Sequence, residues 1–258
     1  MKFGGASLAT PDHFSQIARL IIQRMQHHPR IVIVVSAMGN TTDELIALAK
    51  QVNPDPPSRE YDMLITAGER ISIALLAMAL ARQGQEAVSF TGSQSGIITC
   101  LRHTNARIVD VRPHRLLSAL DKGQIVIVAG FQGVSRQGDV TTLGRGGSDT
   151  TAVALGAALR SPRVEFFKDV PGVFSEDPKK NQQALQYPHL SYEDAFQLMQ
   201  RGARVLHPRC IQLAKKNGLP LHVRSFQCVN QENNEGTFIG THDSQGFQEA
   251  RYEDEVIE

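Results

Sequence analysis

Three glycines and an arginine stand directly before an apolar run in TTLGRGGSDTTAVALGAAL, which covers residues 141–159. Glycine permits positive φ angles and lets the backbone approach a ligand closely. A helix start offers free N–H groups that favour an anion, and Arg145 could grip a carboxylate or phosphate with two parallel hydrogen bonds. We expect Ser148 to cap the helix and Asp149 to lie in its first turn. The stretch indicates an anion-binding turn, although a capped helix behind an ordinary glycine loop fits the same pattern.

A second glycine turn, KFGGAS, lies at residues 2–7. It matches neither the P-loop pattern nor GxGxxG. A lysine next to two glycines could contact a phosphate as a point charge. Taken alone, the stretch is more typical of a plain turn.

These turns need a scaffold, and the rest of the chain predicts alternating helices and buried strands. Continuous β-branched or apolar runs are typical of strands in a parallel sheet, and they occur at 30–35, 86–90, 124–131, 164–167 and 219–225. Helices are expected at 11–26, 44–51, 68–84 and 113–120, from the 141–159 stretch onward, and twice more before the last strand. Residues 53–58 read as a loop and 133–143 as a hairpin that turns near Gln137-Gly138.

The alternation implies an α/β fold with a mostly parallel sheet that is covered on both faces. Ligands of such sheets bind beyond the carboxyl ends of the strands, where the glycine turns fall. The helix over 68–84 is apolar nearly all round, so we expect it to be buried, with Leu75 and Met78 in the core.

Composition excludes several classes of function. The 258 residues include 27 basic and 26 acidic ones, and a net charge of +1 gives no footprint for a nucleic-acid partner. No apolar run looks long enough to span a bilayer, and the N-terminus carries no targeting segment. Cys100, Cys210 and Cys228 are odd in number and lack metal spacing, which favours reduced thiols and a cytoplasmic location. We expect no membrane partner and no metal ligated by the protein's own side chains.

Taken together, several stretches resemble the aspartate kinase branch of the amino acid kinase family. They occur in the family's order and cover nearly the whole chain: KFGGAS, VVSAMGNTTDELI, GERISIALL, IVIVAGFQG, TTLGRGGSDTTAV, FFKDVPGVFSEDP, GARVLHPR, PLHVRS and EGTFIG. Each stretch alone is weak, but their joint occurrence is specific.

The resemblance implies a three-layer α/β/α sandwich around a mostly parallel sheet, the amino acid kinase-like fold. A catalytic domain would cover 1–226, with an aspartate-binding half over about 1–140 and a nucleotide-binding half over about 141–226. Residues 227–258 would form a C-terminal extension without ACT domains, so feedback inhibition through such domains is not expected. The resemblance implies a homo-oligomer and is also compatible with a separate regulatory subunit.

The implied activity moves the γ-phosphoryl group of ATP, with Mg²⁺, onto the side-chain carboxylate of L-aspartate. The product, 4-phospho-L-aspartate, is the first intermediate towards lysine, threonine and methionine. Such a transfer needs alignment of the reactants and neutralisation of charge on the moving group.

The resemblance also implies roles for individual residues. Lys2 stabilises the moving phosphoryl group, and Asp149 orients Lys2 as a buried anion between cations. Arg145 clamps a carboxylate of the substrate. The remaining implied contacts are to substrate through Ser36, Thr42 and Glu69, and to nucleotide through Lys2, Phe3, Gly4, Gly5, Lys168, Asp169, Phe174, Lys179, Arg204 and Val205.

Several of these residues also fit plain structural roles. Glu69 could complement a helix dipole, and Thr42-Asp43 could cap a helix that starts at Glu44. His207, before Pro208, is expected to be a structural turn residue, and Cys210 to be buried. The acidic end, EARYEDEVIE, is expected to be solvated.

The sequence departs from the family pattern at its start. Family members carry an apolar strand before the lysine, whereas Met1 directly precedes Lys2 here. Without that strand, we expect an exposed neighbouring strand edge and a Lys2 that lies on a frayed terminus. Phe174 lacks the hydroxyl that the family often has there. Lys179 stands where the family usually has arginine, and Arg204 where it usually has lysine. These changes predict altered but not abolished nucleotide affinity.

Three rival functions stay open at this point. One is another kinase of the same family, acting on a glutamate derivative, carbamate or UMP. A second is an inactive kinase-like subunit that binds nucleotide or a partner. The third, a plain dinucleotide-binding module, is weak because no GxGxxG follows a predicted strand.

Overall fold

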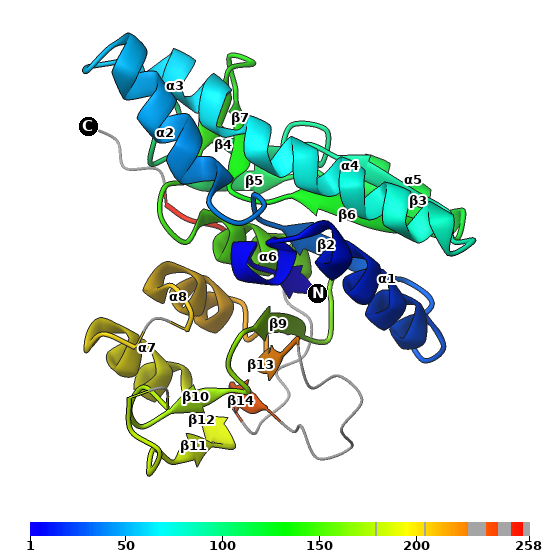
Figure 1. The fold of residues 1–258 in the computed structure, drawn as a ribbon, viewed down its shortest axis with the longest axis vertical. Coiled ribbons are helices and arrows are strands. Elements are labelled where there is room, and N and C mark those ends of the chain that lie inside the picture. Colours follow the sequence, from blue (N-terminus) through cyan, green and yellow to red (C-terminus); the bar gives the residue numbers. More distant parts are fainter. Residues whose placement is uncertain (179, 204, 227–235, 242–248, 255–258) are drawn as a thin grey trace.

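An eight-stranded sheet runs through the molecule in the computed structural model, which describes residues 1–178, 180–203, 205–226, 236–241 and 249–254 (Figure 1). The strand order is β12-β14-β13-β9-β1-β2-β6-β3. Its members are β1 (Lys2–Phe3), β2 (Val32–Val35), β3 (Ala87–Phe90), β6 (Ile125–Ala129), β9 (Val164–Lys168), β12 (His189–Leu190), β13 (Leu221–Ser225) and β14 (Thr237–Ile239). All strands from β13 to β3 are parallel, and β14 runs antiparallel to β13.

The first strand is short but central. Lys2 lies opposite Val34 of β2 on one side and Phe166 of β9 on the other. The Met1 ammonium group donates to the Val32 carbonyl oxygen at 2.8 Å, and only 4% of Lys2 is exposed. The expectation of a frayed Lys2 beside an open strand edge is wrong, because two flanking parallel strands supply backbone partners for a two-residue strand.

Helices cover both faces of the sheet, which confirms the predicted three-layer α/β/α architecture. On one face, α1 (Pro11–Met25) and α4 (Ala67–Arg82) pack with inward side chains such as Ile33 and Ile127. On the other, α5 (His114–Asp121), α6 (Gly147–Ala158) and α8 (Pro208–Lys216) pack with side chains such as Val34. Ile33 and Val34 are neighbours that enter different core clusters, because successive strand residues point to opposite faces.

Smaller elements extend the upper and lower parts of Figure 1. A four-stranded sheet has the order β5-β4-β7-β8, and β10 pairs with β11. The bounds are β4 (Ile97–Thr99), β5 (Ile108–Val111), β7 (Gln132–Ser135), β8 (Val140–Thr142), β10 (Val173–Phe174), β11 (Gln186–Tyr187), α2 (Thr41–Val52), α3 (Ser58–Ile65), α7 (Tyr192–Gln200) and the 3-10 turn η1 (Gly5–Leu8). The predicted hairpin is confirmed as β7 and β8, with Gly138 at φ 92° in its turn.

The long apolar helix is only partly buried. Met78 on α4 is 66% exposed, so its predicted place in the core is wrong, and Leu75 is only partly buried. By length and composition the helical stretch Ser58–Arg82 could cross a membrane, contrary to the sequence expectation. However, 44% of its most apolar window is buried inside the fold, and packed core helices meet the same criterion.

The C-terminal end is not simply solvated. Tyr252 packs against the core cluster of α6 and α8, and the Glu253 side chain is 8% exposed. The prediction for the acidic end is therefore wrong over these two residues. Its physical cause is a set of buried partners for the Glu253 carboxylate, which lie far away in the sequence.

Candidate active site

The glycine turns gather at one edge of the main sheet, because β1, β2, β6 and β9 are parallel and end together. The chain leaves β1 to form β2 on one side and returns later to form β9 on the other. Ligands of open α/β sheets bind at such a reversal of strand order. The candidate site therefore lies around the carboxyl end of β1.

A cluster of three charges occupies this position, two of them buried and the third, Lys168, partly buried. Lys2 Nζ lies 2.7 Å from Asp149 Oδ1, and Lys168 Nζ lies 3.4 Å from Asp149 Oδ2. Asp149 therefore lies between two cations, as the sequence analysis expected. Burial alone would raise the pKa of Asp149, but the ammonium groups of Lys168 and Lys2 outweigh it and hold the pKa at about 2. Burial also lowers the pKa of Lys2, and the charge of Asp149 opposes this. We name Lys2, Asp149 and Lys168 the lysine cluster.

The start of α6 positions Asp149. Gly146 caps the helix in the left-handed region at φ 73°, and a Cβ there would lie 2.2 Å from His207 Cγ. Ser148 is not the cap, contrary to prediction. It packs instead against Gly130, where a Cβ would lie 2.8 Å from the Ser148 Cβ. Glycine at 146 is thus required both by backbone conformation and by the close approach of His207.

Arg145 extends from the turn between β8 and α6. Its neighbours Gly144 and Gly146 have φ angles of 72° and 73°. The Arg145 side chain is exposed and forms no ion pair with any residue in the described part of the chain. The guanidinium is therefore available for an anionic ligand in front of the helix start.

The turn after β1 is held against the turn after β2. A Cβ on Gly5 would lie 3.0 Å from the Ala37 carbonyl oxygen, and the Gly39 N–H donates to the Gly5 carbonyl at 3.3 Å. A Cβ on Gly4 would lie 3.6 Å from Lys2 Nζ, so the lysine side chain folds over this glycine. The Phe3 ring is fully buried and stacks on another core ring, so only the backbone of Phe3 could meet a nucleotide.

Glu69 presents a buried carboxylate near the cluster. Its Oε1 accepts from the Ala37 N–H at 3.1 Å, while Oε2 is buried and has no hydrogen-bond partner among the described residues. Burial raises the pKa of Glu69 to about 7, although its hydrogen bonds and the charge of Lys2 work in the opposite direction. Gly68 lets α4 come this close, since a Cβ there would lie 2.7 Å from the Ala37 Cβ. The alternative of a mere dipole partner does not account for the burial of an unpartnered oxygen.

Ser36 and Thr42 flank the same turn. The Ser36 N–H donates to the Phe3 carbonyl at 3.1 Å. Thr42 lies in the first turn of α2, which begins at Thr41 after Asn40. The alternative in which Thr42-Asp43 caps a helix at Glu44 is therefore wrong.

The residues expected to bind nucleotide are spread over several elements. Lys168 ends β9 within the lysine cluster, and Asp169 follows it at the surface. Phe174 lies half-buried on β10, and Val205 packs partly against the core before α8. Lys179 and Arg204 lie outside the described residues.

One buried residue at the back of the site escaped the sequence analysis. Asp62 is fully buried, and its carboxylate accepts from Thr142 Oγ1 at 2.6 Å and from the Thr104 N–H at 3.1 Å. His103 Nδ1 lies 2.8 Å from the same carboxylate. This network ties α3 to β8 immediately before the Gly144 turn. No local pattern signals it, because the partners lie about 40 and 80 residues along the chain.

A cavity of about 400 Å³ lies at the opposite edge of the sheet. Its lining includes Met1, Val32 and Val164, at the amino ends of the strands, together with Arg24 and Glu165, which pair with each other at 3.5 Å. No member of the lysine cluster lines it. The candidate active site is therefore assigned from its charges and its place in the sheet rather than from cavity size.

Comparison with known proteins places this site in a family context. Residues 1–225 match the amino acid kinase family. The chain is 52% identical to an aspartokinase from Mycolicibacterium smegmatis over 225 residues, which are 87% of this chain and 53% of that protein. It therefore spans about half the length of the curated relatives it matches.

Solved structures give the same picture. Aspartate kinase from Synechocystis superposes with a TM-score of 0.83 and 40% identity, over 95% of this chain and 40% of that one. Escherichia coli aspartokinase III, in complex with aspartate and ADP, superposes with a TM-score of 0.83 and 25% identity, over 94% of this chain and 64% of that one.

Proposed function

The chain belongs to the amino acid kinase family, and from this premise we propose that it is an aspartate kinase. It transfers the γ-phosphoryl group of ATP to the side-chain carboxylate of L-aspartate and yields 4-phospho-L-aspartate and ADP. We propose further that this product feeds lysine, threonine and methionine synthesis in the cytoplasm.

The observation that carries the proposal is the lysine cluster at the end of β1. The buried Lys2 and the partly buried Lys168 share one carboxylate, so the cluster has one more cation than anions in a setting of lower dielectric than water. Such preorganised charge stabilises the negative oxygens of a phosphoryl group in transit. Asp149 holds both lysines in place, and its charge opposes the effect of burial, which lowers the pKa of Lys2.

Transfer between two anions requires the acceptor carboxylate to be held in line with the γ-phosphorus. In this proposal an oxygen of the aspartate side chain forms the new P–O bond while the bond to the ADP oxygen breaks. Arg145 binds the acceptor carboxylate and offsets its charge. This holds the attacking oxygen in line with the γ-phosphorus. Lys2, folded over Gly4, contacts the group that moves.

The amino-acid character of the substrate is supported by Glu69. A buried carboxylate oxygen without a described partner is costly unless a ligand satisfies it. The α-ammonium group of aspartate supplies both the donor and the opposite charge. The hydroxyls of Thr42 and Ser36 then bind the carboxylate end.

Mg²⁺ is proposed to enter the site as a complex with ATP rather than at a metal site of its own. The described residues contain no group of three or more histidine, cysteine, aspartate or glutamate side chains that could hold a metal ion. Mg²⁺ commonly binds to nucleotide phosphates and water with few protein ligands, so it would arrive with the nucleotide and neutralise phosphate charge. The turn at Gly4-Gly5 and the end of β9 at Lys168-Asp169 are the proposed contacts of the triphosphate.

Trapping the acyl phosphate with hydroxylamine tests the proposal. Incubation with ATP, Mg²⁺, L-aspartate and hydroxylamine should yield aspartyl hydroxamate in step with ADP. A parallel panel with glutamate, carbamate and UMP should release no comparable ADP. Turnover of one of those substrates instead would assign another kinase of the family, and nucleotide binding without any turnover would assign an inactive subunit.

A further inference from the structure

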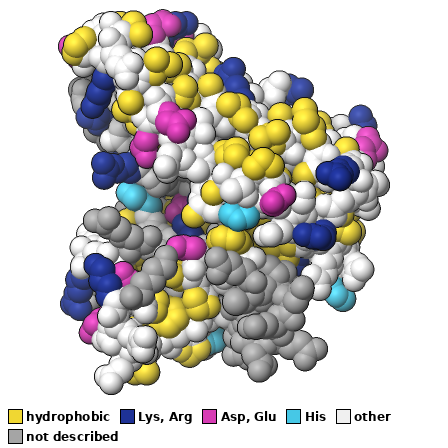
Figure 2. All heavy atoms as spheres, in the orientation of Figure 1, with side chains coloured by type: hydrophobic (Ala, Val, Ile, Leu, Met, Phe, Trp, Pro, Cys, Tyr) yellow, Lys and Arg dark blue, Asp and Glu magenta, His cyan; other side chains and the backbone are white. Residues whose placement is uncertain are grey.

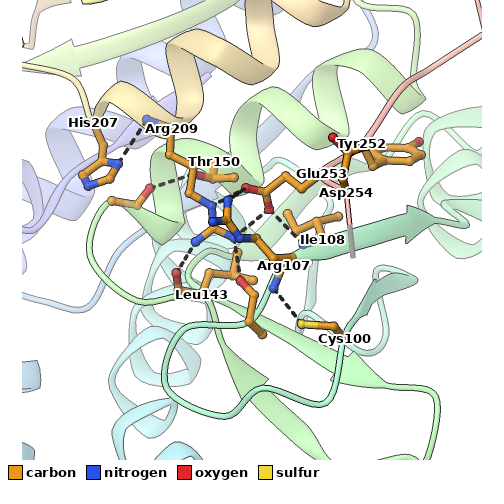
Figure 3. Close-up of polar contacts among 12 residues, drawn as sticks. Cys100, Arg107, Ile108, Leu143, Thr150, His207, Arg209, Tyr252, Glu253 and Asp254 are labelled. Atoms are coloured by element: carbon orange, nitrogen blue, oxygen red, sulfur yellow. Dashed lines mark hydrogen bonds and ion pairs between the residues drawn. The ribbon is translucent and has the colours of Figure 1, made fainter. Parts of the chain in front are cut away.

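An arginine at the start of α8 touches the loop that carries Arg145. Arg209 donates through Nη1 to the Leu143 carbonyl and through Nη2 to the Ala106 carbonyl at 2.5 Å. Leu143 directly precedes Gly144, so this guanidinium holds the first end of the loop over residues 144–147, which we name the Arg145 loop (Figure 3).

The second end of the loop rests on the same helix start. His207 caps α8 by accepting from the Arg209 N–H at 3.3 Å. Its ring lies so close to Gly146 that a Cβ there would overlap it. The prediction of a structural turn residue at His207 is thus confirmed, and both ends of the Arg145 loop are set by residues 207–209.

Arg209 is itself held from the C-terminal segment. Its Nη2 lies 2.6 Å from Glu253 Oε2, and its Nε donates to Oε1 of the same carboxylate. The two side chains are 10% and 8% exposed. Bidentate pairs of this kind fix both orientation and charge, so Glu253 determines where the guanidinium points.

The carboxylate is anchored on its other side as well. Its Oε2 accepts from the Ile108 N–H at 2.9 Å, and the Glu253 N–H donates back to the Ile108 carbonyl at 3.0 Å. Asn217, just after α8, exchanges two hydrogen bonds of 2.8 Å with the backbone of Arg251. Residues 251–254 thus form a strap between β5 and α8.

We propose that Glu253 and Arg209 are positioning residues for the Arg145 loop. The strap fixes the guanidinium of Arg209, Arg209 and His207 fix residues 143–147, and these residues aim Arg145 at the acceptor carboxylate. The inference rests on the proposed function for the identity of that acceptor. The coupling between strap and loop does not depend on it.

The test compares three variants of the strap. Glu253→Ala removes the carboxylate, and Glu253→Gln keeps its shape while losing its charge. Asp254→Asn is the matched control, because the Asp254 side chain is 95% exposed and, among the described residues, pairs only with Lys216 at the far end of α8. Hydrogen exchange of the 143–149 segment and the two KM values are measured for each protein.

In Glu253→Ala, we expect exchange at 143–149 to accelerate and the KM for L-aspartate to rise, each on the order of tenfold. The KM for ATP should stay unchanged. For Glu253→Gln, the exchange rate and the KM for L-aspartate should lie between those of Glu253→Ala and the parent protein. Asp254→Asn should match the parent in both. Unchanged exchange at 143–149, or an equal rise in both KM values, would overturn the proposal. If the parent protein forms no aspartyl hydroxamate, the proposed function fails, and the exchange data alone decide whether the strap positions the loop.

Discussion

Asp149 is the residue on which the charge arrangement depends. It is buried between Lys2 and Lys168, and its carboxylate is the shared partner of both ammonium groups. Removing one member of a buried ionic group leaves uncompensated charge, which costs more than the group itself contributes. We therefore expect the residue to affect stability and, in the proposed reaction, rate.

Asp149→Asn should lower the free energy of unfolding by about 3 kcal/mol, because the buried Lys2 and the partly buried Lys168 then face each other without an anion. Denaturant unfolding measures this. Asp121→Asn is the matched control, since its pair with Arg30 is largely exposed and such pairs contribute about 1 kcal/mol or less. Equal losses in the two variants would show that the cluster is not electrostatically coupled.

In the proposed site, Glu69 is expected to make aspartate binding sensitive to pH. Its pKa of about 7 lies above the ordinary value because burial favours the neutral acid. Only the ionised form attracts an ammonium group, so binding weakens as pH falls through 7. The KM for L-aspartate should rise about tenfold from pH 8 to pH 6, because the ionised fraction of such a group falls by that factor.

Glu69→Gln provides the comparison for the pH profile. The amide does not titrate, so this variant should show a raised KM at pH 8 and little change down to pH 6. A parent profile that is flat over this range would remove Glu69 from the ammonium site.

At the scale of elements, the Arg145 loop and α8 act as one unit. Gly146 combines a left-handed φ with a close contact to His207. Gly123 has a similar φ of 75°, but a Cβ there would meet nothing within 4 Å. Comparing the same substitution at Gly146 and Gly123 therefore separates the effect of backbone strain from the effect of steric overlap.

Gly146→Ala should destabilise the fold by about 2 kcal/mol more than Gly123→Ala, which is the range observed for overpacking. Thermal unfolding measures the difference. Adding His207→Gly to Gly146→Ala should recover part of the loss, because this removes the His207 Cβ as well as the ring, the atoms that a Cβ at 146 would overlap. Independent, additive effects would contradict the packing described for α8.

The sequence predicted the long strands and helices well, for a clear physical reason. Runs such as 124–131 and 164–167 are buried on both faces, so their composition alone indicates strands. The elements it missed, β4, β5, β10–β12, β14 and α3, have two to eight residues and form because neighbouring elements pair or pack with them. The start of β1 was misjudged for the same reason.

The residues of the candidate site were named from the family resemblance, at positions where local pattern also allowed such chemistry. Lys2, Asp149 and Glu69 stand in glycine turns or at helix starts, and the structure brings Lys2 and Asp149 into direct contact. Asp62 and Glu253 could not be predicted, because a buried carboxylate is identified by partners from distant parts of the chain. The exposed side of α4 could not be predicted either, since an all-round apolar helix shows no preferred face.

At the scale of the whole molecule, large apolar side chains remain exposed on neighbouring helices (Figure 2). They are Leu48 and Val52 on α2, Met63 on α3, and Ile71 and Met78 on α4. Exposed apolar clusters commonly mark association surfaces, which supports the proposed homo-oligomer.

Ile71→Lys combined with Met78→Lys should shift the protein to a smaller species, measured by light scattering after size exclusion. Leu185→Lys is the control, because Leu185 is 73% exposed but lies away from α4, before β11. If the parent is a monomer, or if both variants behave alike, this surface is not the interface.

The proposed function depends on the lysine cluster stabilising the phosphoryl group as it passes from ATP to L-aspartate. The most direct measurement is the rate of aspartyl hydroxamate formation by Lys2→Met at saturating ATP and L-aspartate. Lys122→Met, at an exposed lysine, serves as the control. We predict a loss in kcat on the order of 100-fold for Lys2→Met, as expected for one electrostatic contact to the transition state, and none for Lys122→Met. A Lys2→Met rate equal to that of the parent would contradict it.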